Sequence, residues 1–121
     1  MSSKFPELTR GVSRTLGTLR KDLPDVMTAF SMLAKSASAE GALDAKTKEL
    51  IALALGVAAH CDPCIGFHVQ ALVKLGTSRR ELEEALAMAV YMGGGPSLMY
   101  SANALDAFEE FSTPATPGAA S

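Results

Sequence analysis

Residues 50–59, LIALALGVAA, form a segment without a single polar side chain. They follow the polar residues 46–49 and Asp44, a good N-cap residue, so we expect one helix over residues 45–59. A helix that is apolar on every side must be buried on every side. In a chain of 121 residues, the other helices can hardly surround it alone. We therefore predict a homo-oligomer whose interface covers part of this helix.

The rest of the chain also predicts helices and contains no convincing strand. Prolines suited to a first helical position, glycines suited to the position beyond a last one, and a capping box from Ser78 to Glu81 mark the boundaries. We expect an all-α fold of six helices. Besides residues 45–59, these cover residues 7–19, from Pro24 to about 40, from an Asp62 N-cap to Leu75, residues 79–92 and from Pro96 to about 111.

These boundaries also predict how the chain is organised. Residues 1–19 form a helical N-terminal segment, and residues 20–111 form the main helical domain. The tail over residues 112–121, STPATPGAAS, is rich in proline, serine and alanine, a composition typical of disorder.

Charge and hydropathy exclude several classes of partner. A net charge of −2 and scattered Lys and Arg give no footprint for nucleic acid. The longest apolar run is about half of what a membrane span needs, and the N-terminus, MSSKFPELTRG, lacks the apolar core of a signal peptide. We expect a cytoplasmic protein that binds neither nucleic acid nor membranes.

Both cysteines and both histidines fall within residues 60–68, HCDPCIGFH. In a reducing cytoplasm, two cysteines three apart are more often catalytic or metal-binding than structural. At the start of a helix, free N–H groups and the helix dipole favour the thiolate, and an i, i+3 pair can also close a disulfide. His68 lies one turn after Cys64, so it can reach that sulfur as a base or as an ion-pair partner.

Glu49 is the other informative residue, because it shares a helix face with Gly56 and His60. It is either a solvated first-turn carboxylate or a partner that orients His68. Simple antiparallel pairing leaves Glu49 displaced along the axis from His68. Contact would therefore need a bridging water, a steep crossing angle or a neighbouring subunit.

A zinc site is the main alternative, since His60, Cys61, Cys64 and His68 are ligands of the zinc type. Adjacent side chains such as those of His60 and Cys61 point apart, which argues against one tetrahedral site. His60 is then a residue at a helix C-terminus, and we predict no metal and no cofactor. A simpler interpretation is that both cysteines are buried as small apolar residues.

The pattern Glu49-x11-Cys61-x2-Cys64-x3-His68 resembles the signature of the alkylhydroperoxidase D branch of the carboxymuconolactone decarboxylase superfamily. The flanking residues agree over residues 20–111. The resemblance implies an all-helical domain that assembles into trimers or hexamers. It also implies that Cys64 attacks the peroxide, that Cys61 is the resolving cysteine, and that His68 and Glu49 relay protons. Pro63 departs from the branch, which has a histidine just before the second cysteine.

The resemblance favours a thiol-dependent peroxidase or disulfide oxidoreductase acting on a hydroperoxide or a small disulfide. The Cys64 thiolate would attack the O–O bond and become a sulfenic acid, and Cys61 would condense with it to a disulfide, releasing water. A dithiol reductant would reset the pair. Two alternatives remain: a lyase acting on a small cyclic acid with His68 as general base, and an oligomeric metal-sensing module.

Overall fold

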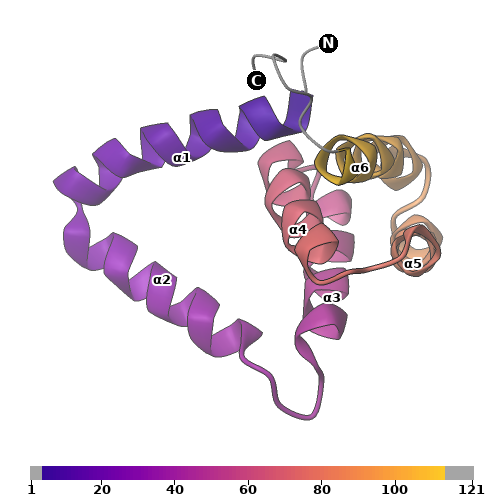
Figure 1. Cartoon of the computed structure of the whole chain (residues 1–121), viewed down its shortest axis with the longest axis horizontal. Coiled ribbons are helices and arrows are strands. Elements are labelled where there is room, and N and C mark those ends of the chain that lie inside the picture. Colours follow the sequence, from indigo (N-terminus) through magenta and orange to yellow (C-terminus); the bar gives the residue numbers. More distant parts are fainter. Residues whose placement is uncertain (1–3, 114–121) are drawn as a thin grey trace.

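The computed structural model describes residues 4–113, which contain six α-helices and no strand. The predicted all-α fold of six helices is therefore confirmed. The predicted disordered tail lies outside the described residues, except for Ser112 and Thr113. The helices, shown in Figure 1, are α1 (Lys4–Asp22), α2 (Pro24–Ser38), α3 (Ala45–Ala58), α4 (Asp62–Lys74), α5 (Arg79–Gly93) and α6 (Gly95–Ser112).

The first helix is longer at both ends than predicted, and its start is helical because it packs on the core. Phe5 is fully buried, and Thr9 is buried one turn later. The amide N–H of Phe5 donates a 2.7 Å hydrogen bond to a carboxylate oxygen of Glu110 on α6. A carboxylate at this position satisfies a free N–H group and complements the positive end of the helix dipole.

A glycine sets how closely α1 approaches α4. A Cβ atom at Gly66 of α4 would lie only 2.7 Å from the Cγ2 atom of Thr9, closer than carbon atoms pack. Gly66 is therefore the position at which the first turns of α1 dock on α4.

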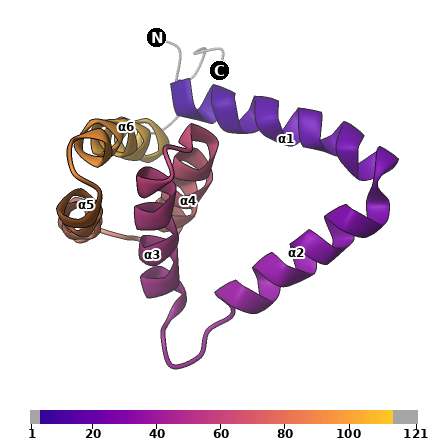
Figure 2. The same cartoon turned by 180° about the vertical axis from the view of Figure 1, so that it is seen from behind.

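The hydrophobic core lies between α3, α4, α5 and α6, with Phe5 of α1 added at one end. In Figure 1 and in the opposite view of Figure 2, α3 and α4 run side by side, and α5 and α6 lie on one side of this pair. The fully buried side chains of the core, besides Phe5, are Leu53, Val57, Ile65, Val69, Leu72, Leu82, Ala104 and Ala107.

Residues 10–38, which we call the arm, stand away from this core. In Figures 1 and 2, α1 extends beyond α4, and α2 turns back at an angle towards the start of α3. No residue of α2 is buried. Its apolar side chains recur at helical spacing, yet Val26, Phe30 and Leu33 are 61%, 64% and 63% exposed. The apolar face of α2 is therefore uncovered within this chain.

The apolar third helix is covered on one side only. Leu53, Gly56 and Val57 are buried, whereas Ile51 is 46% exposed and Leu55 is 66% exposed. This matches the expectation that one chain of this length cannot surround the helix. None of the helices between residues 4 and 113 has the length and apolar character needed to cross a membrane.

Polar side chains define the starts of α3 and α5. Asp44 accepts a 2.8 Å hydrogen bond from the N–H of Thr47. The side-chain hydroxyl of Thr47 and, after it, this backbone N–H hold the pKa of Asp44 below its usual value. The predicted capping box of Ser78 and Glu81 is present. Lys46 donates to Glu81 over 2.7 Å; this bond, more than the backbone N–H of Ser78, lowers the pKa of Glu81.

Candidate active site at the junction of α3 and α4

The chain turns from α3 into α4 through a Schellman motif. The N–H of His60 donates to the carbonyl of Val57 over 3.1 Å, and the N–H of Cys61 donates to that of Gly56 over 3.0 Å. His60 has a φ of 57°, in the left-handed region, and no other non-glycine residue between 4 and 113 has a positive φ. α4 ends in the same motif, with Gly76 at φ 75°. His60 thus stands where glycine is the usual residue.

Cys61 is the N-cap of α4, so the prediction that Asp62 caps this helix is wrong. The Schellman turn ends at Cys61, whose backbone is extended, and Asp62 is already helical. The Sγ atom of Cys61 accepts a 3.2 Å hydrogen bond from the N–H of Cys64. The carboxylate of Asp62 instead accepts a 3.0 Å hydrogen bond from Nδ2 of Asn103 on α6.

Cys61 and Cys64 form a disulfide, with Cα atoms 5.2 Å apart. This separation is usual for disulfides, and residues three apart at the start of a helix have it without distortion of the backbone. Both residues are half-buried. The structure therefore describes the pair in its oxidised state, in which neither sulfur is a free thiol.

His68 and Glu49 are in direct contact, without a bridging water or a second subunit. The Nδ1 atom of His68 lies 2.7 Å from Oε1 of Glu49, and the two side chains are 35% and 19% exposed. The two helices approach closely at Gly56. A Cβ atom at Gly56 would lie 3.2 Å from the Cβ of Cys64.

The approach at Gly56 explains how the two side chains meet. Counted from there, Glu49 is seven residues back on α3, and His68 is four residues beyond Cys64 on α4. At 1.5 Å per residue, the mismatch along the axis is about 4.5 Å. Two side chains of this length span such a distance, so the displacement expected from the sequence is small enough for direct contact.

The contact with Glu49 determines which ring nitrogen of His68 is free to accept a proton. A carboxylate can only accept a hydrogen bond, so Nδ1 must carry the proton in this contact. In the neutral ring, Nε2 is then the unprotonated nitrogen. Within residues 4–113, the structure contains no hydrogen bond between His68 and either sulfur. In this oxidised state, Cys64 is bonded to Cys61 instead.

The four zinc-type residues are not brought together in this state. The ring of His60 stacks on Tyr100 of α6, with ring centroids 4.7 Å apart and planes 12° from parallel. His68 is bound to Glu49, and the cysteines are bound to each other. In the described part of the chain, no three His, Cys, Asp or Glu side chains are arranged to hold a metal ion.

Asn103 is the site residue that the sequence analysis missed. Its partner, Asp62, is 41 residues earlier, and no local pattern links an asparagine in the middle of one helix to the start of another. Tyr100 of the same helix packs on the ring of His60, a contact that joins residues 40 positions apart in the chain.

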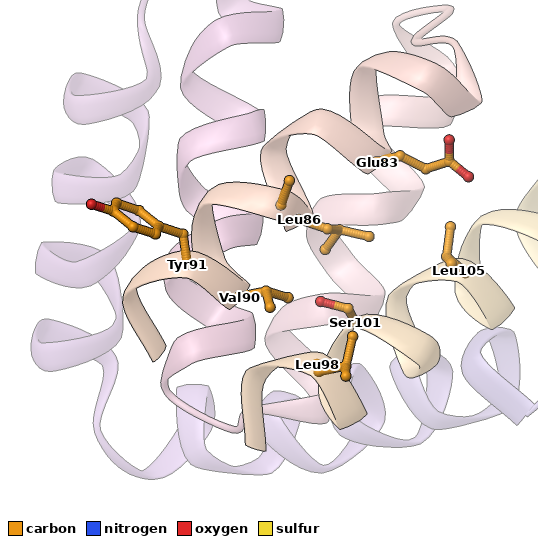
Figure 3. A pocket seen from close by; sticks show the side chains of 8 residues that line it. Glu83, Leu86, Val90, Tyr91, Leu98, Ser101 and Leu105 are labelled. Carbon is orange, nitrogen blue, oxygen red and sulfur yellow. The ribbon is translucent and has the colours of Figure 1, made fainter. Parts of the chain in front are cut away.

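A separate groove lies between α5 and α6. Figure 3 shows its apolar lining, with Leu86 and Val90 from α5 and Leu98 and Leu105 from α6. Its volume is about 490 Å³, and it is widely open to solvent. None of its lining residues belongs to the dithiol site.

Comparison with known proteins places this geometry in context. The sequence model of the Carboxymuconolactone decarboxylase family matches residues 24–107. The chain is 61% identical to a carboxymuconolactone decarboxylase family protein from Legionella pneumophila, with a TM-score of 0.91 over 93% of this chain and 100% of that one. An uncharacterized protein from Cupriavidus necator is 41% identical over 98 residues, which cover 81% of this chain and 87% of the relative.

A second solved structure is a family member from Thermotoga maritima. It is 30% identical to this chain, with a TM-score of 0.76 over 84% of this chain and 87% of that one. A possible involvement in the antioxidative response is stated for that protein.

Proposed function

This chain belongs to the carboxymuconolactone decarboxylase family, and within that family we propose that it is a thiol-dependent peroxidase or disulfide oxidoreductase. The observation that carries the proposal is the Cys61–Cys64 disulfide at the start of α4, one turn from a histidine held by a carboxylate. The start of a helix stabilises a thiolate, and a base oriented by a third group is the usual means of activating a nucleophile. The possible antioxidative role stated for the Thermotoga protein points in the same direction.

In the proposed reaction, Nε2 of His68 takes the thiol proton of Cys64. The thiolate then attacks one oxygen of a hydroperoxide, the O–O bond breaks, and the sulfur becomes a sulfenic acid. The proton held by His68 goes to the leaving alkoxide, which becomes an alcohol. Glu49 stabilises the imidazolium that forms between these two steps.

Cys61 completes the cycle. Its thiol sulfur attacks the sulfur of the sulfenic acid, the S–O bond breaks, and the hydroxyl group takes up the thiol proton of Cys61 and leaves as water. The disulfide of the present structure results. A dithiol reductant then exchanges with this disulfide, gives up two electrons and two protons, and becomes a disulfide itself. We propose that the cytoplasm supplies this reductant.

Pro63 limits the proposed relay to three residues. The related branch has a histidine at this position, whereas proline provides neither an imidazole nor an N–H group. In this chain, the relay would consist of Cys64, His68 and Glu49. His60 does not replace the missing ring in the oxidised state, because its own ring is stacked on Tyr100.

We also propose that the protein works as a homotrimer or homohexamer. The uncovered apolar side chains of α2, together with Ile51 and Leu55 of α3, support this proposal. Monomeric proteins rarely expose apolar side chains in such number on neighbouring helices. A second copy of the chain would cover them and also bury the open side of α3.

The peroxidase proposal is tested by mixing the reduced protein with tert-butyl hydroperoxide and counting free thiols over time. The wild-type chain should lose both of its thiols. The Cys64→Ser variant, which keeps Cys61, is the matched control. Thiol loss in the wild type that is no faster than in this variant would refute the proposal.

Two further variants and a metal analysis separate the alternatives. A lyase that uses the His68–Glu49 pair on a small cyclic acid should keep its turnover in Cys61→Ala and lose it in His68→Ala. A metal-sensing module should contain nearly one zinc ion per chain when it is purified without added metal, as elemental analysis would show.

A further inference from the structure

Two side chains of α6 contact the turn that carries Cys61. Tyr100 packs its ring on His60, the residue before the cysteine, and Asn103 donates a hydrogen bond to Asp62, the residue after it. Tyr100 and Asn103 are three residues apart, so they lie on one face of α6. We refer to this pair of contacts as the α6 clamp.

The clamp is mounted on a rigid support. Ala104 and Ala107 of the same helix are fully buried in the core, and Tyr100 itself packs against that core. Side chains fixed to a buried helix hold their partners more firmly than side chains on a loop. The turn between α3 and α4 is thus tied to the core at the residues on either side of Cys61.

The left-handed backbone of His60 indicates that the histidine ring makes a favourable contact at this position. A left-handed conformation is unfavourable for a residue with a side chain, and at the equivalent position of α4 the chain has Gly76. Histidine at this position weakens the turn as a backbone element, although it is among the more tolerated residues there. The stacking on Tyr100 is the contact that the ring adds.

We propose that the α6 clamp positions Cys61 in the reduced protein and thereby stabilises the Cys61–Cys64 disulfide relative to the dithiol. The inference rests on the redox use of this pair proposed above. A disulfide forms more favourably when its two thiols are already held close together, because less conformational entropy is lost on closure. The clamp acts on the disulfide through the backbone of the turn, so its members are positioning residues: His60, Tyr100 and Asn103.

The test is the equilibrium between the protein and glutathione buffers, extended with dithiothreitol at the reducing end. In this exchange, the protein disulfide gains two electrons and two protons, and two glutathione thiols or one dithiothreitol lose them and become a disulfide. The fraction of oxidised protein at each buffer ratio gives the equilibrium constant. No peroxide is used, so the result stands whether or not the protein is a peroxidase.

His60→Asn and Asn103→Ala each remove one contact of the clamp. Asparagine tolerates the left-handed backbone but cannot stack, and alanine removes the hydrogen bond to Asp62. In each variant, the disulfide should become easier to reduce. The equilibrium constant for forming the disulfide from the dithiol should fall by about threefold to tenfold. For a two-electron couple, tenfold corresponds to about 30 mV.

Two controls accompany these variants. Tyr100→Phe keeps the ring and should retain the wild-type potential. Asp106→Asn changes an exposed residue of the same helix, one turn beyond Asn103, and should also leave the potential unchanged. His60 is exposed, so the His60→Asn variant should fold, which thermal unfolding would verify.

Three results would overturn the inference. One is a wild-type potential in both His60→Asn and Asn103→Ala. Another is an equal shift in Asp106→Asn. The third is a disulfide that becomes harder to reduce in Asn103→Ala. That sign would show that the main effect is electrostatic: the carboxylate of Asp62, no longer bound to Asn103, would destabilise the nearby thiolate of the reduced protein. A protein that shows the expected shifts but does not consume peroxide would refute the proposed peroxidase and leave the clamp intact.

Discussion

The imidazole of His68 and the carboxylate of Glu49 form a 2.7 Å contact between α4 and α3. This contact selects the tautomer of His68 and fixes the plane of its ring, and both effects depend on a residue outside the HCDPCIGFH segment. In the proposed reaction, the chemistry of the cysteine pair therefore depends on how α3 and α4 pack, and mutations at this contact can test that dependence.

Replacing Glu49 by glutamine should slow the oxidation of Cys64 by peroxide. The amide oxygen can still accept from Nδ1 of His68, but it carries no charge to stabilise the imidazolium. We expect the rate of thiol loss to fall by about tenfold to a hundredfold, within the range that general base catalysis contributes. Glu84→Gln, an exposed change on α5, should keep the wild-type rate. Equal rates in Glu49→Gln and wild type would show that the carboxylate has no part in the reaction.

Replacing Gly56 by alanine should disturb the site without unfolding the protein. An alanine in the interior of a helix normally stabilises it by about 0.5–1 kcal/mol relative to glycine. At Gly56 the added Cβ would lie 3.2 Å from the Cβ of Cys64, so the start of α4 must shift. We expect the gain in stability to be lost and thiol oxidation to slow. Gly17→Ala on α1, where a Cβ meets no atom within 4 Å, is the matched control and should raise the melting temperature. A Gly56→Ala variant as stable and as active as Gly17→Ala would contradict the close approach.

Placing a charge on the uncovered face of α2 should weaken the assembly of the protein. Phe30 is 64% exposed in a single chain, so Phe30→Glu places a carboxylate where we propose that a second copy packs. Light scattering during size-exclusion chromatography should show a smaller species at micromolar concentration. Thr28→Glu, on the opposite side of the same helix, should keep the wild-type mass. A wild-type chain that is monomeric under these conditions would refute the proposed oligomer.

Acid should remove part of the stability that the starts of α3 and α5 provide. The pKa values of Asp44 and Glu81 are lowered by folding from ordinary values of 3.8 and 4.5. A carboxyl group with a lowered pKa in the folded state stabilises the protein above its unfolded pKa. That contribution is lost as the pH falls through the folded value. We expect the double variant Asp44→Asn, Glu81→Gln to have a lower melting temperature than wild type at pH 7. Below about pH 4 the difference should narrow. A constant difference between the two proteins from pH 7 to pH 3 would show that neither carboxylate is linked to folding.

The sequence predicted the helices well because their boundary signals are local. Pro24, Gly76 and the capping box of Ser78 and Glu81 each act within one turn of the chain, and each occurs where the pattern indicates. The N-cap of α4 was misassigned because it depends on how α3 ends. Once His60 adopts the left-handed conformation, the extended residue is Cys61 and not Asp62.

The contacts between helices were less predictable, for reasons of distance and rotation. Helical spacing alone did not decide whether Glu49 reaches His68, since the answer depends on the close approach at Gly56. The bond between Asn103 and Asp62 depends on the rotation of α6 about its axis, which its own composition does not determine. The periodicity of α2 indicated an apolar face, but it contains no information on what covers that face.

The fit between Gly66 and Thr9 links two positions that are far apart in the chain. A larger side chain at residue 66 is compatible with the same docking only if residue 9 becomes smaller, so the two positions are not free to diverge independently. Gly66 lies two residues beyond Cys64, on the helix that carries the disulfide. Natural variation in the N-terminal helix is therefore constrained by the helix that carries the disulfide, and covariation of residues 9 and 66 among relatives would be the record of that constraint.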